Sequence, residues 1–249
     1  RDPETYAEGP RPLVSRHDSQ VTLMRHVFFL FSLLFASQVH GQVEPVTVLS
    51  SPEGYTVQVD GEDFFVRGMN WGYVPIGTNY SYDLWSKSDA FIETVLHREM
   101  KQLKAMGVNA IRLFNVVPPR WVTWIRDKYG IYTAVNHLMG RYGFEVNGSF
   151  VPNIDYNNPA HRKAILDDLK STIERFKDVR GVLLYMLGNE NNYGLHWTSF
   201  EIEALPGKEY DARAEHLYSL MGEAATLVKG IDAKRPTMLT NGDLQYLEL

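Results

Sequence analysis

Downstream of residue 64, short apolar runs alternate with longer segments in which apolar residues recur at helical spacing. The short runs are rich in β-branched and aromatic residues and predict strands at 64–70, 109–115, 131–136, 182–187 and 237–240. The longer segments predict helices at about 90–106, 118–128, 159–177 and from about residue 217 to Gly230. Strands that alternate with helices in this way indicate an α/β fold with a parallel sheet and crossover helices.

The predicted helices carry residues that commonly begin or end a helix. Ser88 or Asp89 is placed to cap the helix predicted at 90–106, and Gly107 follows its last apolar residue. Gly130 ends the next helix in the same way, and Asn158-Pro159 places a capping side chain before a proline in the first turn. These local residues support the element boundaries independently of the apolar spacing.

Residues 42–63 predict a short β preface to this alternating pattern. β-forming residues at 47–49 and 55–59 flank a Ser-Pro-Glu-Gly turn, and Asp60-Gly61 is a strong hairpin turn that leads into the strand at 64–70.

Five strand and helix units in succession predict the first part of an eight-unit (β/α)8 barrel, which usually takes about 250 residues. We therefore expect residues 64–249 to form the N-terminal part of such a barrel. An open doubly wound sheet is the alternative, but no G-x-G-x-x-G follows the first strand. The chain also lacks a G-x-S-x-G elbow, a Walker loop and an H-E-x-x-H helix, which argues against serine acyl transfer, nucleotide hydrolysis and zinc proteolysis.

The segment 24–41 has the layout of a secretory signal peptide. Met24-Arg25-His26 precedes an apolar run at 27–36, and small residues up to Gly41 fit cleavage after that residue. The run is shorter than the roughly 20 residues of a membrane span, so we expect no stable membrane span and a secreted or periplasmic protein. A buried core helix or an uncleaved anchor are the alternatives. The polar residues 1–23 have no periodic apolar face and are predicted to be non-structural.

Composition and charge exclude several classes of function. The 25 Lys and Arg residues and 30 Asp and Glu residues give a net charge of −5, with no basic cluster for a phosphate backbone, so we expect no nucleic-acid partner. The chain has no cysteine, which excludes disulfides, thiolate zinc sites and cysteine nucleophiles. We expect no metal or organic cofactor.

Polar residues close four of the predicted strands, where a parallel barrel places its active site. They are Asn70-Trp71, Asn115, Asn136-His137 and Asn189-Glu190. Amides and carboxylates hydrogen-bond hydroxyl groups, and aromatic faces stack on pyranose rings, so this combination indicates a sugar site. Further candidates for binding hydroxyl groups are Tyr73, Asn191, Asn192, Tyr193, His196 and Trp197.

Three segments carry a resemblance to a known family. They are VDGEDFFVRGMN at 59–70, NAIRLFN at 109–115 and LGNEN at 187–191. Over about residues 55–247 the chain resembles the retaining glycoside hydrolases of clan A, and within that clan the TIM-barrel domain of glycoside hydrolase family 2. The resemblance implies that Glu190 is the acid/base, that Asn189 contacts the sugar 2-hydroxyl, and that Arg112 lies beneath the nucleophile.

In that clan the nucleophile comes from the end of strand seven, so we expect it beyond the five strands predicted here. Retention requires a second carboxylate about 5 to 5.5 Å from the acid. Glu248 lies 58 residues after Glu190, has no motif around it and is a poor substitute.

Several of these residues could instead have a purely structural role. Arg112 alternates with apolar neighbours and points to the opposite face, where a buried ion pair unrelated to catalysis is the alternative to a role in the site. His137 belongs either to the rim of the site or to a loop, and Trp121 and Trp124 are expected in the core. Asn147-Gly148-Ser149 matches a glycosylation sequon, as does the sequence at 79–81.

The sequence thus predicts an exported glycosidase or transglycosidase that acts on a β-linked oligo- or polysaccharide. The alternative from another class is a non-catalytic carbohydrate-binding or interaction module on a degenerate barrel. A barrel lyase or aldolase is a weaker alternative, because no strand-end lysine is evident for a Schiff base.

Overall fold

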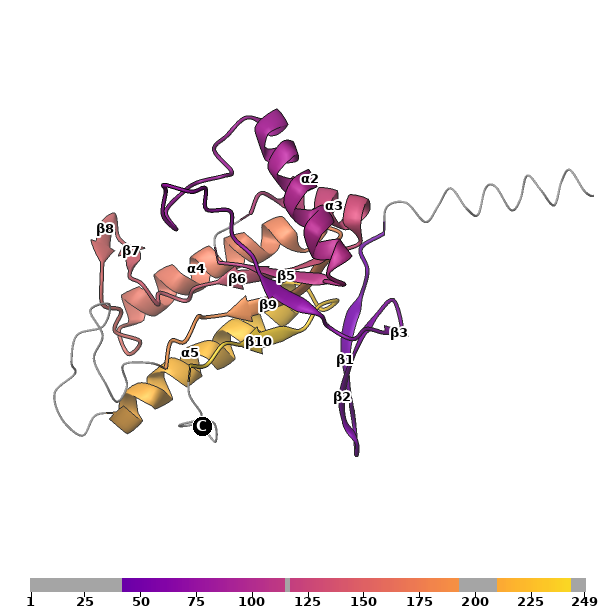
Figure 1. The fold of residues 1–249 in the computed structure, drawn as a ribbon. Helices are drawn as coiled ribbons and strands as arrows, with labels where there is room; N and C mark the ends of the chain where they lie inside the picture. The colour runs from indigo at the N-terminus through magenta and orange to yellow at the C-terminus, as the bar shows by residue number, and fades with distance from the viewer. Residues whose placement is uncertain (1–41, 115–116, 193–209, 243–249) are drawn as a thin grey trace, which may run out of the picture. The chain divides into compact units, whose positions relative to one another are not determined.

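The structure is a computed structural model, and it describes residues 42–114, 117–192 and 210–242. Its main sheet has five strands, which are β4 (Gly68–Asn70), β5 (Ala110–Leu113), β6 (Tyr132–His137), β9 (Val182–Leu187) and β10 (Thr237–Leu239). All neighbouring pairs are parallel. The spatial order β10-β9-β6-β5-β4 follows the chain (Figure 1). A doubly wound sheet reverses its strand order at a switch point, so this sequential order confirms the prediction of a partial (β/α)8 barrel.

The helices between the strands begin and end close to the predicted residues. They are α2 (Asp89–Ala105), α3 (Pro119–Tyr129), α4 (Pro159–Phe176) and α5 (Tyr210–Ile231). Ser88 caps α2, since its side chain accepts a hydrogen bond from a backbone N–H of the first turn, and Asn158 caps α4 in the same way. Gly130 ends α3 in the left-handed conformation, with φ 66°. α5 runs through Gly230, so the prediction that this glycine ends the helix is wrong.

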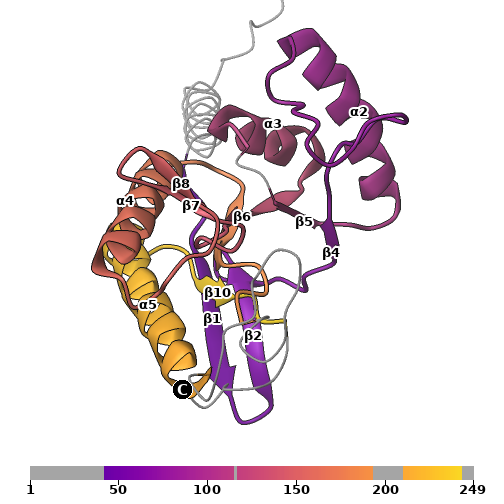
Figure 2. The ribbon, with the colours of Figure 1, turned by 90° about the vertical axis from the view of Figure 1, so that its left-hand side faces the viewer.

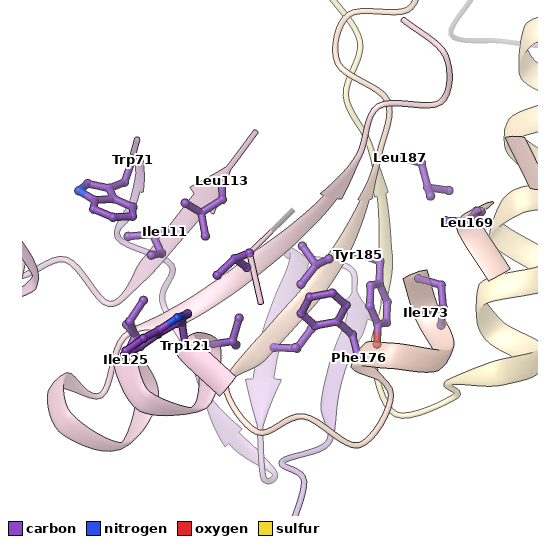
Figure 3. Packing of buried hydrophobic residues seen from close by; sticks show 14 of the residues in the cluster. Trp71, Ile111, Leu113, Trp121, Ile125, Leu169, Ile173, Phe176, Tyr185 and Leu187 are labelled. Carbon is purple, nitrogen blue, oxygen red and sulfur yellow. The ribbon is translucent and has the colours of Figure 1, made fainter. Parts of the chain in front are cut away.

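One face of the sheet packs against the helices. A large cluster of buried apolar side chains lies between this face and the helices (Figure 3). It includes Ile111, Leu113, Tyr185 and Leu187 of the strands and Phe176 of α4. Trp121 is also part of it, and Trp124 packs against it, which confirms that both tryptophans belong to the core. Because side chains alternate along a strand, the residues between these apolar positions point to the opposite face, which we call the inner face.

The β preface packs against the inner face near the start of the strands. It consists of β1 (Val46–Ser51), β2 (Gly54–Val59) and β3 (Glu62–Asp63), with Asp60 and Gly61 at positive φ in the turn between β2 and β3. Val46 and Val59 form a second buried cluster with Ala110, Tyr132 and Leu183. Figure 2 shows this hairpin near β10 and away from α2 and α3. The preface therefore leaves the carboxyl ends of the strands uncovered by its own residues.

The first barrel strand is shorter than the predicted range 64–70. The side chain of Asn109 takes the place of a strand ladder there, because its Oδ1 accepts a hydrogen bond from Arg67 N at 2.7 Å and its Nδ2 donates to Phe65 O at 2.8 Å. The ladder between β4 and β5 begins only at the pair Gly68 and Ala110. The side chain of Asn109 therefore holds residues 65 and 67 together with one backbone hydrogen bond, from Asn109 N to Arg67 O at 3.0 Å.

A hairpin occupies part of the connection from β6 to α4, for which no strands are predicted. β7 (Phe144–Val146) and β8 (Ser149–Val151) pair across Asn147 and Gly148, whose φ angles are 52° and 76°. An Asn-Gly pair at positive φ is typical of a two-residue hairpin turn. The residues that match a glycosylation sequon thus also form this turn. None of the described helices is both long and apolar enough to cross a membrane.

Candidate functional site

Arg112 lies at the centre of the candidate site, on the inner face of β5. Its Nη2 donates hydrogen bonds to Asn136 Oδ1 on β6 at 3.1 Å and to Asn189 Oδ1 after β9 at 2.7 Å. The guanidinium carbon also lies 4.4 Å from the centroid of the Phe114 ring, two residues further along the chain. One arginine therefore holds together the carboxyl ends of three neighbouring strands.

The amide of Asn189 is fixed at both ends. Arginine nitrogens only donate, so the atom of Asn189 that faces Arg112 is the oxygen. Asn189 Nδ2 consequently points the other way and donates to the hydroxyl of Tyr142 at 2.8 Å. Asn189 is 8% exposed and cannot rotate without losing both bonds.

Glu190 follows directly, on a backbone that glutamate rarely adopts. Its φ is 57°, and its backbone N–H donates to Thr240 O after β10 at 2.7 Å. Burial lowers the pKa of Arg112, and the negative charge of Glu190 opposes that shift, so the two side chains interact electrostatically. Left-handed backbone at non-glycine residues costs free energy and is often found in functional sites.

Asn191 holds the loop that carries Glu190. Its Oδ1 accepts from Asn189 N at 2.7 Å, while its Nδ2 donates to Leu138 O at 3.2 Å, Met139 O at 3.1 Å and Tyr156 Oη at 3.0 Å. Burial raises the pKa of Tyr156 to about 12, so its hydroxyl remains protonated and donates to Met139 O. These bonds tie the end of β9 to the connection that follows β6.

Gly188 is required for this arrangement. Its φ is 87°, and a Cβ atom there would lie 2.6 Å from Oδ1 of Asn191. Asn192, 1% exposed, accepts from Gly242 N at 2.7 Å on the other side of the loop. The side chains of Asn191 and Asn192, predicted to bind hydroxyl groups, are therefore occupied in holding the loop.

Two buried donors at the centre of the site have no acceptor among the described residues. They are Arg112 Nε and Asn136 Nδ2. An unpaired buried donor is costly, and an arginine next to an amide N–H suits a carboxylate or another oxygen acceptor.

The other predicted site residues lie in varied surroundings. Asn70 pairs with Arg112 in the strand register and is exposed, whereas Trp71 is 7% exposed and packs against Trp85. Tyr73 contacts Phe91 of α2 by an edge-to-face ring contact. Five residues named from the sequence lie outside the described part of the chain, namely Asn115, Tyr193, His196, Trp197 and Glu248.

His137 faces α4, one residue beyond the asparagine that contacts Arg112. Its Nδ1 accepts from Met139 N at 3.2 Å, so in the neutral ring Nε2 carries the hydrogen that bonds to Asp168 Oδ2 at 2.9 Å. That hydrogen bond lowers the pKa of Asp168. Both ring nitrogens of His137 thus have partners within the fold. Of the two residues that end β6, Asn136 is the one that contacts Arg112.

Sequence reasoning did not single out Tyr142 or Phe114. Both are partly exposed, at 43% and 40%, and both contact the groups around Arg112. Alternation from Arg112 places Phe114 on the same face, so this residue could have been found from the strand pattern. Nothing in the sequence near Tyr142 indicates its contact with Asn189.

The described side chains hold no group of three or more His, Cys, Asp or Glu residues that could bind a metal ion. The site instead combines one carboxylic acid with amides, an arginine, a tyrosine hydroxyl and an aromatic face. These groups hydrogen-bond and stack on sugars, and the acid can exchange a proton.

Comparisons with known proteins agree with this chemistry. Residues 77–211 match the family described as glycosyl hydrolases family 2, TIM barrel domain. Over 140 residues the chain is 28% identical to a β-galactosidase of Arthrobacter sp. (strain B7), covering 56% of this chain and 13% of that protein. A β-galactosidase of Clostridium acetobutylicum is 32% identical over 101 residues, covering 39% of this chain and 11% of that protein.

Solved structures show the same fold. The β-glucuronidase of Parabacteroides merdae aligns with a TM-score of 0.53 at 19% identity, covering 78% of this chain and 20% of that chain. β-Glucuronidase 3 of Bacteroides uniformis aligns with a TM-score of 0.53 at 20% identity and the same coverage. The chain spans a fifth or less of the length of these relatives. It belongs to glycosyl hydrolase family 2 and carries part of that family's TIM barrel domain.

Proposed function

We propose that the protein is a retaining glycosidase for β-linked glycans, in which Glu190 protonates the leaving oxygen. The observation that carries this proposal is the position of Glu190 at the carboxyl end of β9, beside an asparagine whose amide is held by Arg112 and Tyr142. An acid next to oriented hydroxyl-binding groups is what glycoside cleavage requires.

Glu190 acts twice in this mechanism. As an acid it gives its proton to the oxygen of the departing sugar, and as a carboxylate it then takes a proton from the water or sugar hydroxyl that attacks the intermediate. Asn189 Nδ2 has a second hydrogen besides the one bonded to Tyr142, and this hydrogen is available to the sugar 2-hydroxyl. Water as acceptor gives hydrolysis, and a sugar hydroxyl gives transglycosylation.

A second carboxylate has to attack the anomeric carbon, and we place it outside the described residues. Arg112 Nε and Asn136 Nδ2 support this assignment, because they are buried donors on two residues in contact and neither has an acceptor among the described residues. A carboxylate that they hold would remain ionised, as a nucleophile must.

The relatives named above are β-galactosidases and β-glucuronidases, so aryl β-galactosides and aryl β-glucuronides are the first substrates to test. The decisive variant in the full-length protein is Glu190→Gln, which removes the acid and keeps the side-chain shape. Turnover of substrates with poor leaving groups should be lost, while activated aryl glycosides lose less in the first step because their leaving group needs no proton.

Glu145→Gln is the matched control, since Glu145 is an exposed glutamate on β7. Equal losses on both kinds of substrate would remove Glu190 from the acid role. Glycan binding without turnover by the wild-type protein would favour the non-catalytic carbohydrate-binding module.

We also propose that the protein is exported after cleavage at Gly41, on the basis of the apolar run at 27–36 and the small residues that follow. Mass spectrometry of the protein from the culture medium or periplasm should find Gln42 at the N-terminus. A mature protein that begins upstream of Met24 would contradict this proposal.

A further inference from the structure

The direction of one hydrogen bond determines what the hydroxyl of Tyr142 can do. Arg112 fixes the oxygen of Asn189, so Nδ2 is the donor in the 2.8 Å bond to Tyr142 and the tyrosine oxygen is the acceptor. The tyrosine O–H hydrogen must therefore point away from Asn189. It has no acceptor among the described residues.

Tyr142 is also open to a ligand. Its side chain is 43% exposed although its hydroxyl contacts a buried amide. Asn189 and Glu190 are consecutive residues, so the hydroxyl lies at the edge of the site where the acid acts. A hydroxyl that accepts inside the site and has a hydrogen directed outward is prepared to donate to a bound molecule.

The backbone around Tyr142 is held in place. Gly143 has φ 89° and packs so closely that a Cβ atom would lie 2.5 Å from Cζ of Phe150 and 2.8 Å from Val151 O. Its N–H donates to Gly140 O at 3.1 Å, and the guanidinium of Arg141 lies 5.0 Å from the centroid of the Tyr142 ring. Tyr142 is thus presented from a turn packed against β8, so little ordering is needed when a ligand binds.

We propose that Tyr142 is a specificity-determining residue that donates a hydrogen bond to a sugar hydroxyl next to the one bound by Asn189. This inference rests on the proposed glycosidase function and adds a residue that selects among sugars. A site built to donate to a hydroxyl discriminates against sugars that lack it.

The test combines Tyr142→Phe in the full-length protein with a series of aryl β-glycosides, each lacking one ring hydroxyl. On the parent glycoside the variant should lose about 10-fold in kcat/KM, the value of one hydrogen bond between neutral groups. On the analogue that lacks the partner hydroxyl, the loss should be smaller by the contribution of that bond, because neither protein can form it there. Any loss that remains comes from the missing acceptor of Asn189 Nδ2.

Asn189→Ala in the same series separates direct contact from an indirect effect. If the loss of kcat/KM in the two variants becomes smaller on different analogues, Tyr142 and Asn189 each contact a different hydroxyl of the sugar. The inference is overturned if the loss in Tyr142→Phe becomes smaller only on the analogue on which the loss in Asn189→Ala also becomes smaller. It is likewise overturned if Tyr142→Phe reduces kcat/KM equally on every analogue. In both cases Tyr142 acts only by positioning Asn189. Tyr55→Phe, on an exposed residue of β2, should leave all constants unchanged.

These outcomes are distinct from failure of the proposed function. Loss of turnover in Glu190→Gln, as predicted above, supports the glycosidase whatever Tyr142 does. A wild-type protein that turns over none of the aryl glycosides would overturn both proposals.

Discussion

Replacing Asn191 with alanine tests how the loop that carries Glu190 is held. The substitution removes the acceptor of Asn189 N–H and the donor to Leu138 O and Met139 O, all in surroundings where Asn191 is 7% exposed. Each unsatisfied buried group costs about 1–3 kcal/mol. Leu138 O keeps Arg141 N–H as a partner and Met139 O keeps the hydroxyl of Tyr156, so the N–H of Asn189 is the group left without its acceptor. We expect the free energy of unfolding to fall by about 2 kcal/mol.

For a domain of this size, such a loss lowers the unfolding midpoint by about 6 °C. Thermal unfolding followed by the fluorescence of the buried tryptophans measures it. Asn153→Ala, at an exposed asparagine of the connection between β6 and α4, is the control and should change the midpoint little. Aryl-glycoside turnover measured below the transition should fall in Asn191→Ala only, because Asn191 directly follows Glu190 in the chain.

Asn191→Asp predicts in which direction stability should change with pH. The introduced carboxyl keeps an acceptor for Asn189 N–H but directs its other oxygen at two carbonyl groups, which raises its pKa in the folded state above the unfolded value of about 3.9. Stability relative to wild type should therefore be greatest below about pH 3.9 and decrease as pH rises through the folded pKa. A midpoint within about 1 °C of wild type for Asn191→Ala, with no pH dependence for Asn191→Asp, would refute this account of the loop.

Two further substitutions test neighbouring contacts. Gly188→Ala should lower the free energy of unfolding by more than the roughly 1–2 kcal/mol of left-handed backbone strain, because the new Cβ displaces the amide of Asn191. It should also reduce turnover. Gly148→Ala is the control in the same unfolding experiments, since Gly148 has φ 76° with open space around it and should show the strain alone. Asp168→Asn should lower stability by less than about 1 kcal/mol at neutral pH, since the carboxylate is half exposed. Because His137 lowers the pKa of Asp168, this contribution is present above the unfolded pKa and is lost as pH falls through the folded pKa, so urea midpoints of variant and wild type should converge in acid. A difference that grows in acid would contradict the hydrogen bond's role.

The element order of this protein could be predicted from the sequence because its signals are local. Apolar spacing identified the five strands of the main sheet and the helices between them, though not the hairpin of β7 and β8. Ser88, Asn158 and Gly130 act at helix ends as predicted. The polar residues after the run at 182–187 could be found for the same reason, since an uninterrupted apolar strand that ends in Asn-Glu is visible in one short segment. Such features depend on residues within a few positions of each other.

Tertiary structure decided which strand-end residues meet. Within β6, strand register directs Asn136 to Arg112 and His137 to α4, a difference of one position that reverses the face. The contact between Asn189 and Tyr142 joins residues 47 positions apart, and it exists because the connection after β6 folds back over the end of β9. Apolar periodicity cannot specify such a contact, since it reports which face of an element is buried and not which distant polar group will satisfy a buried amide.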